Sequence, residues 1–233
     1  RAVTEGYATL EEVGAITDGR RRKVERRADG RHADGLTAVG RELARLPLDP
    51  RLGRILLAAR ERNLLREMLV IVAGLSVMDP RERPAEKEAE ADKAHAKFDH
   101  VDSDFLSFLE IWSAMSQFRK PEGGYWRGKM RNYCQSSFLS MRRMMEWESV
   151  VKELSRALTE RGGKRPLRLP DDRNKWGDAD EIHKCLLAGM PTQIGEWDKE
   201  KKIYRGTGGR LFAVFPGSGL FGGKRPEWVL AFD

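Results

Sequence analysis

Residues 64–78 form the longest apolar stretch of the chain, and only Arg66 and Glu67 place charge within it. A helix that is apolar on every side has to be buried among other elements. We therefore predict a central, buried helix, which Asp79 and Pro80 end because the residue before a proline disfavours helical geometry.

The sequence indicates neither export nor membrane insertion. A membrane span needs about 18 uninterrupted apolar residues, and the apolar stretch is shorter than that. Residues 1–6 show no signal-peptide pattern. Cys134 and Cys185 both stand in apolar, helix-like contexts, which favours free thiols in a reducing cytosol. We expect a cytoplasmic protein. Because the sequence starts on Arg1 without Met, we also expect it to be part of a longer chain.

Residues 1–62 combine short helical patterns with a basic loop. Apolar side chains recur at helical spacing over residues 38–46, and Thr37 precedes them as an N-cap. Asp49 and Pro50 are the N-cap and first residue typical of a further helix. Small helices around a basic, hairpin-like loop predict a winged helix.

A helix is also predicted ahead of that loop, with Tyr7, Leu10 and Val13 on one face and its end at Gly14. The loop itself carries a cluster of basic residues that is either a basic wing or a mobile loop, namely Arg20, Arg21, Arg22, Lys23, Arg26 and Arg27.

Residues 63–163 show mainly helical patterns and predict a helical bundle. Phe105, Leu109 and Trp112 mark an amphipathic helix. A later helix carries a stripe of core residues at steps of three and four, namely Met144, Trp147, Val151, Leu154 and Leu158. Its opposite face is either solvated or contacts phosphates, and it carries Arg142, Arg143, Lys152 and Arg156.

Residues 164–233 predict a short helix at 180–188 and then four strands. The strand-like segments are 193–197, 201–205, 211–215 and 228–232. Short strands with Gly-rich turns predict a small, OB-fold-like β-barrel, which is incomplete if its last strand ends with the sequence. The predicted fold class is therefore multidomain, mainly α with a β part: a winged helix, a helical bundle and a small barrel.

Charge is segregated along the chain, which has a net charge of +7. Residues 119–143 contain seven basic residues and one acidic residue, and residues 199–225 show the same balance. Residues 79–110 reverse it, with ten acidic and five basic residues. Basic segments of this kind favour an anionic partner.

Basic and aromatic residues alternate in the predicted barrel. On a strand, such rings either stack on the bases of a single-stranded nucleic acid or point into the core, and the sequence leaves both readings open. The residues concerned are Lys202, Tyr204, Arg205, Arg210, Phe212 and Phe215.

No group of residues forms a catalytic or metal-binding constellation. The four histidines are scattered, and His95 and His100 stand five apart, whereas metal-ligand pairs on a helix prefer a spacing of three or four. We interpret these two as surface polar residues on a charged helix.

One segment has the spacing of a phosphate-binding loop. Gly123 is followed by Gly128 and Lys129, but Met130 stands where the motif requires Ser or Thr to hold magnesium. We therefore predict no nucleotide site here.

Several ordered motifs resemble one family. Residues 36–51, with the sequence LTAVGRELARLPLDPR, closely resemble the winged-helix signature that follows the motor domains of DEAH-box RNA helicases. Further segments resemble the bacterial HrpA branch: SVMDPRERP at 76–84, SDFL at 103–106, FLS at 138–140, FPGSGLF at 215–221 and PEWV at 226–229. Gln135 stands where we expect Arg, which departs from the family pattern.

The resemblance implies a 3′-to-5′ RNA helicase driven by ATP hydrolysis, with ATP and Mg²⁺ bound by two RecA-like motor domains. None of that family's ATPase motifs occurs in this sequence, so we expect the chain alone to be no enzyme and to hold no cofactor. The implied domains are a winged helix at 1–62, a ratchet domain lining the RNA channel at 63–163, and an OB-fold gating its mouth at 164–233.

The leading hypothesis is thus an accessory, channel-forming region that binds single-stranded RNA beside motor domains in the same protein. The predicted RNA-binding residues are Arg142, Arg143, Lys202, Arg205, Arg210, Ser218, Lys224 and Arg225. The alternative is an interaction platform for protein regulators, in which the acidic residues 79–110 dock a basic surface.

Overall fold

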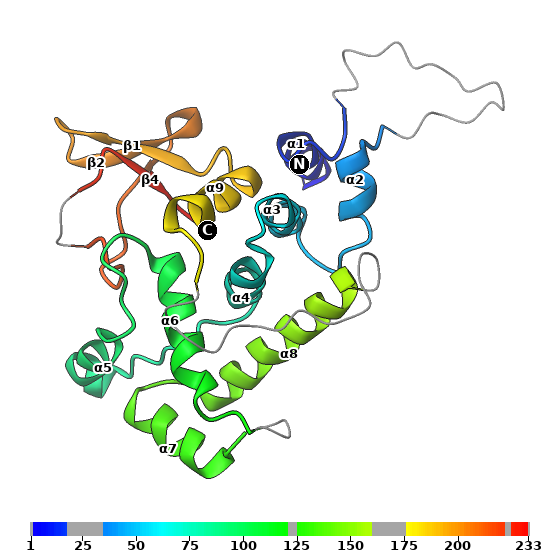
Figure 1. The fold of residues 1–233 in the computed structure, drawn as a ribbon. Coiled ribbons are helices and arrows are strands. Elements are labelled where there is room, and N and C mark those ends of the chain that lie inside the picture. The colour runs from blue at the N-terminus through cyan, green and yellow to red at the C-terminus, as the bar shows by residue number, and fades with distance from the viewer. Residues whose placement is uncertain (1, 18–34, 121–124, 160–175, 222–224, 233) are drawn as a thin grey trace.

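The computed structural model describes residues 2–17, 35–120, 125–159, 176–221 and 225–232, and within them the chain is mainly helical with one small sheet (Figure 1). The helices are α1 (Ala2–Glu12), α2 (Ala38–Leu43), α3 (Pro50–Glu61), α4 (Leu65–Leu75), α5 (Glu88–His95), α6 (Asp104–Ser116), α7 (Arg127–Ser136), α8 (Met141–Thr159) and α9 (Ala179–Gly189), with 3-10 turns η1 (Ala85–Lys87) and η3 (Thr207–Gly209). The strands are β1 (Ile194–Asp198), β2 (Ile203–Gly206), β3 (Leu211–Phe212) and β4 (Trp228–Leu230).

Helix α4 lies at the centre of the helical part, as its apolar sequence predicts. Its side chains from Met68 to Ala73 are fully buried, and α3, α6, α8 and α9 all pack against it. Gly74 lets neighbours approach closely, because a Cβ there would lie 2.7 Å from the Phe108 ring. Trp147 of α8 anchors to the same helix, since its indole N–H donates to the Val70 carbonyl at 2.9 Å.

Helix α6 is not amphipathic, which corrects the prediction. Every residue from Asp104 to Ser116 is buried except Asp104 and Glu110. The apolar pattern locates one packed face, against α4 and α8, but segments distant in sequence cover the rest. The indole of Trp176, for example, donates a hydrogen bond of 2.9 Å to the Ser113 hydroxyl.

Helix α7 was not predicted as a separate element, whereas α5 corresponds to the charged helix predicted around His95. His95 at the end of α5 is also buried, with 8% exposure, and its Nε2 lies 3.0 Å from the Phe138 carbonyl oxygen. It is therefore a hydrogen-bonded interior residue and not the surface residue that the sequence suggested.

The first three helices share a small core made of Val13, Ala15, Leu43, Leu46 and Leu57. The predicted caps are confirmed: the Thr37 hydroxyl accepts from the Gly40 N–H, and the Asp49 carboxylate accepts from the Arg51 N–H. Helix α2 ends earlier than predicted because the chain tightens into i→i−3 bonds, such as Leu46 N–H to the Leu43 carbonyl, ahead of the proline.

An antiparallel bridge between Ile16 and Leu36 joins the two ends of the predicted basic loop. The basic cluster of that loop, Arg20 to Arg27, lies outside the described residues.

The sheet has the strand order β3-β2-β1-β4 with antiparallel pairing throughout. Three consecutive strands with the fourth returned beside the first form a Greek key. Strands β3 and β4 are both shorter than predicted. Strand β3 is short because after Phe212 the chain leaves the sheet and turns at Phe215, whose carbonyl accepts from the Ser218 N–H. Gly195 lets the Phe212 ring lie on the sheet, since a Cβ there would be 2.3 Å from that ring.

The predicted domain boundaries stay predictions. In the structure, helices on both sides of them contribute to one larger core, which includes Ile55 and Leu56 of α3 and Ile182 and Leu186 of α9. Gly189 permits this contact between α9 and α3, because a Cβ there would lie 2.3 Å from the Arg51 carbonyl oxygen.

Candidate nucleic-acid interface

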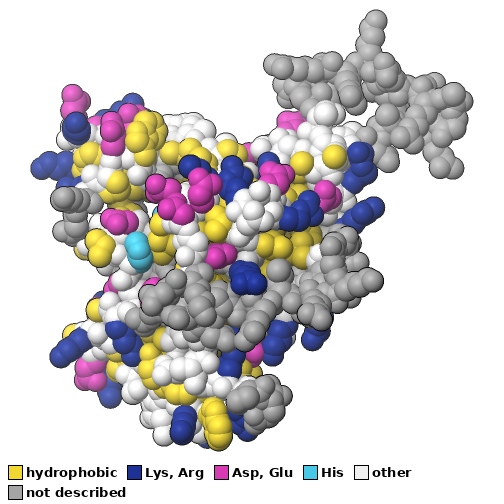
Figure 2. Space-filling model, in the orientation of Figure 1, with side chains coloured by type: hydrophobic (Ala, Val, Ile, Leu, Met, Phe, Trp, Pro, Cys, Tyr) yellow, Lys and Arg dark blue, Asp and Glu magenta, His cyan; other side chains and the backbone are white. Residues whose placement is uncertain are grey.

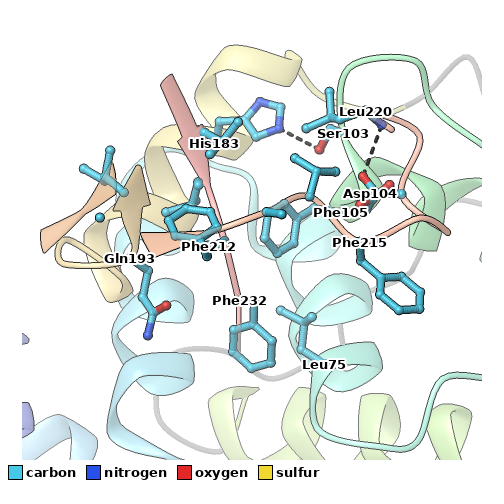
Figure 3. A pocket seen from close by; sticks show the side chains of 18 of the residues that line it. Leu75, Ser103, Asp104, Phe105, His183, Gln193, Phe212, Phe215, Leu220 and Phe232 are labelled. Carbon is cyan, nitrogen blue, oxygen red and sulfur yellow. Dashed lines mark hydrogen bonds between the residues drawn. The ribbon is translucent and has the colours of Figure 1, made fainter. Parts of the chain in front are cut away.

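A cleft of about 650 Å³ separates the sheet from the helical part (Figure 3). Its walls are largely apolar and come from α4, α6, the sheet and the segments on either side of β3 and β4. Figure 3 places Phe105, Phe212 and Phe232 around this cleft, while the ring of Phe215 turns outward. The cleft therefore exists only where elements distant in sequence meet.

Two polar contacts hold the cleft walls together. The backbone N–H of Gly219 donates to Oδ1 of Asp104 at 2.8 Å, which docks the segment after β3 on the start of α6. Nε2 of His183 on α9 lies 2.7 Å from the hydroxyl of Ser103, the residue that precedes α6 (Figure 3). Burial lowers the pKa of His183, so the ring is neutral at neutral pH.

Three arginines line the cleft. Arg210 is exposed. Arg51 lies 3.5 Å from a Glu12 carboxylate oxygen, and its buried Nε has no hydrogen-bond partner among the described residues. Arg81 pairs with Asp79 at 2.7 Å. Burial opposes the charge of Arg81, but the hydrogen bond to Asp79 and the nearby carboxylates raise its pKa. The cleft thus combines aromatic walls with fixed cations.

A second hollow of about 550 Å³ lies on the sheet beside Trp197. Arg205 and Arg225 both line it. Arg205 pairs with Asp198 at 2.6 Å, and the Arg225 guanidinium lies 4.9 Å from the Trp197 ring centroid. Glu196 and Glu227 also line this hollow, and Figure 2 shows Lys and Arg side chains mixed with Asp and Glu over the sheet. Its carboxylates offset the positive charge.

The predicted RNA-binding residues therefore separate into groups. Arg210 and Ser218 line the cleft, and Arg205 and Arg225 line the second hollow. Lys202 is exposed in the β1–β2 turn with a φ of 53°. Lys224 lies outside the described residues.

The two predicted arginines of α8 differ from each other. Arg142 is exposed. Arg143 is half-buried and donates a hydrogen bond of 3.0 Å to the Asp79 carbonyl, so it ties α8 to the segment after α4.

The three aromatic rings of the predicted barrel segment differ in whether they point into the core or lie exposed. Tyr204 is 1% exposed, belongs to the core, and donates a hydrogen bond to the Pro226 carbonyl at 2.9 Å. Phe212 stacks on Tyr204 with ring centroids 5.7 Å apart. Phe215 is 75% exposed at the cleft. Only Phe215 is thus fully available to a stacking base.

Sequence reasoning missed several cleft residues. Arg51, Arg81 and His183 lie on helices or in connections whose local patterns indicate only structure. For Arg81 a signal was present, since it stands within the SVMDPRERP motif. Arg51 likewise stands at the end of the motif at residues 36–51. For His183 the sequence held no such signal, because its position depends on the packing of α3 against α9.

In the part of the chain that the structure describes, no helix is both long and apolar enough to cross a membrane.

Comparison with known proteins shows which proteins this chain is similar to. Residues 49–108 match the family described as the helicase-associated domain, ratchet-like. The chain is 36% identical over 233 residues to the ATP-dependent RNA helicase HrpA homolog of Haemophilus influenzae, and covers 16% of it. Identity to the Escherichia coli ATP-dependent RNA helicase HrpA is 34% over 233 residues, again 16% of that protein. The pre-mRNA-splicing factor ATP-dependent RNA helicase prp22 of Schizosaccharomyces pombe is 29% identical over 202 residues, which are 84% of this chain and 15% of that protein.

The chain therefore carries a helicase-associated domain of the ratchet-like class. Across its full length it is similar to HrpA-type DEAH helicases and corresponds to their C-terminal region. The resemblance drawn from its motifs is thus confirmed. The chain spans 16% of the length of these two HrpA relatives.

Proposed function

We propose that this chain is the accessory RNA-binding and channel-forming region of an ATP-dependent 3′-to-5′ RNA helicase. The observation that carries the proposal is the cleft between the sheet and the helices, where exposed Phe215 and Arg210 stand beside buried apolar walls. Support also comes from the similarity along the whole chain to proteins named as ATP-dependent RNA helicases.

The cleft offers the two contacts that a single strand needs. Its arginines can neutralise backbone phosphates without reading sequence. The Phe215 ring can stack on a base, which contributes about 1–3 kcal/mol per stacked base. A strand threaded through the cleft would therefore be held mainly by charge and stacking, as a translocating motor requires.

The finer architecture belongs to the same proposal. The Greek-key strand order supports an OB-fold-like part, and the three small helices with the Ile16–Leu36 bridge support a winged helix. ATP and Mg²⁺ would bind to motor domains elsewhere in the longer, cytoplasmic protein.

The test is RNA binding by the purified chain, measured by fluorescence anisotropy with labelled single-stranded RNA at about 50 and 200 mM salt. Affinity should fall steeply with salt. Arg210→Ala should weaken binding similarly for different sequences and lower the salt slope by about 1. Phe215→Ala should weaken binding about 5-fold or more.

The matched control is Phe221→Ala. Phe221 is 55% exposed and does not line the cleft, so its loss should leave affinity unchanged. Equal effects of Phe215→Ala and Phe221→Ala, or binding that ignores salt, would count against the cleft as the RNA path.

The second candidate function is an interaction platform. Residues 82–90, which include the first residues of α5, are all exposed and include Glu86 and Glu90. Arg83 of this segment already pairs with Asp92 of α5 at 2.7 Å, which offsets part of the negative charge of this surface. A protein partner that stays bound after nuclease treatment, and is lost when Glu86 and Glu90 become Gln, would favour this function.

A further inference from the structure

Helix α7 presents a cationic and aromatic surface away from the cleft. Figure 1 places α7 at the opposite end of the helical part from the sheet, and Figure 2 shows Lys, Arg and hydrophobic side chains side by side at that end. Trp126 immediately precedes the helix and is 49% exposed. Arg127, Lys129 and Arg131 on the helix are exposed as well. We call these four residues the α7 patch.

The backbone of Trp126 is held in place. Its backbone N–H donates to the Phe118 carbonyl at 2.8 Å, and its own carbonyl accepts from the Met130 N–H at 2.9 Å. An antiparallel bridge between Arg119 and Tyr125 fixes the adjoining chain. The ring therefore projects from ordered backbone, and a partner would lose little conformational entropy by stacking on it.

The two neighbouring aromatic residues have opposite roles. Tyr125 turns inward, where its hydroxyl accepts from Arg119 at 3.2 Å and burial raises its pKa. Trp126 turns outward and leaves about half of its surface in water. Core packing accounts for Tyr125 but does not account for the exposed indole.

Two ammonium groups lie close to the exposed ring. Lys120 Nζ lies 5.1 Å and Lys129 Nζ 5.6 Å from its centroid, both within cation–π range. Arg127 and Arg131 stand four residues apart and so share one helix face. No residue of the α7 patch forms an ion pair with a described residue, and no Asp or Glu occurs from residue 123 to 145.

From this arrangement we infer that the α7 patch is a second binding surface for single-stranded nucleic acid, on which a base stacks on Trp126. An exposed ring among cations matches both chemical components of a single strand, since the ring takes a base and the cations take the flanking phosphates. An acidic peptide would use the cations but leave the indole without a planar partner. The inference shares its ligand class with the proposed function but uses a different surface.

The test compares two oligonucleotides of about 12 nucleotides, oligouridine and an abasic phosphodiester of the same length. Trp126→Ala should weaken oligouridine binding about 5- to 100-fold and leave abasic binding unchanged, because only a base can stack. Trp126→Phe should restore most of the affinity. Lys129→Ala should weaken both ligands and lower the salt slope by about 1.

Phe215→Ala is tested in parallel and separates the two proposals. If Trp126→Ala weakens oligouridine binding and Phe215→Ala does not, the result supports the α7 patch and rejects the cleft as the binding surface. The reverse result overturns the α7 patch. Equal loss for both ligands on Trp126→Ala, or polyglutamate binding with the same dependence on Trp126, would also overturn it. Absence of oligouridine binding by the unaltered chain would overturn both surfaces. An unchanged circular-dichroism melting curve for Trp126→Ala confirms that the variant is folded.

Discussion

The backbone N–H of Gly219 donates a hydrogen bond of 2.8 Å to Oδ1 of Asp104, the first residue of α6. At this contact a Cβ on Gly219 would lie 2.7 Å from the His100 carbonyl oxygen. The segment that carries Phe215 and Ser218 is thus seated on the helical part by one charged acceptor and one close backbone approach.

Loss of the hydrogen bond or of the close approach should weaken the docking of this segment on the helical part. Asp104→Ala removes the acceptor and should lower the free energy of unfolding by about 1.5–3 kcal/mol, whereas Asp104→Asn keeps an acceptor and should cost less. Gly219→Ala should cost about 1–3 kcal/mol because backbone has to move. Urea unfolding measures each value. Gly6→Ala in α1 is the control, since nothing lies within 4 Å of its Cβ position, and it should be neutral or stabilising. A stable Gly219→Ala variant would contradict the close approach.

Arg142 and Arg143 should separate binding from stability. Arg143→Ala removes the hydrogen bond to the Asp79 carbonyl and should lower the free energy of unfolding by about 1 kcal/mol. Arg142→Ala changes an exposed residue and should stay within about 0.5 kcal/mol. Thermal melts of the pair measure the difference. Equal destabilisation by both substitutions would argue against the tie between α8 and the segment after α4.

Trp147 should be among the most sensitive core positions. Its ring is fully buried, meets Phe108 and Trp112 edge-on, and its indole N–H donates to the Val70 carbonyl. Trp147→Ala should cost about 3–5 kcal/mol, and chemical denaturation tests this. Trp228→Ala is the matched control because Trp228 is 57% exposed, and it should cost much less.

The Cys134 thiol should make stability depend on alkaline pH. Burial raises its pKa from 9.0 to about 11. Between these values the unfolded thiol ionises while the folded thiol stays protonated, so its contribution to stability is full below pH 9.0 and is lost as pH rises toward about 11. The free energy of unfolding should therefore fall more steeply with pH in this window for the unaltered chain than for Cys134→Ala, by on the order of 1 kcal/mol. Parallel slopes would contradict the burial effect.

Local patterns in the sequence predicted what local forces control. The apolar run predicted buried α4, the stripe from Met144 to Leu154 predicted the packed face of α8, and Thr37 and Asp49 predicted helix starts. Each depends on neighbours within a turn or two of helix. Helix α7 escaped prediction because its mostly polar sequence carries little apolar periodicity, and packing against the bundle stabilises it.

For the site, the sequence by itself determined the residue types: two basic segments, one of them with interleaved aromatic residues, and motifs that resemble the HrpA-type helicases. Only the tertiary structure decided their positions. It placed Tyr204 in the core and Phe215 at the cleft, paired Arg205 with Asp198, and gave Arg143 a structural partner. The physical reason is that burial and pairing depend on segments far apart in sequence, as the bond from Gly219 to Asp104 does, and no local pattern records such contacts.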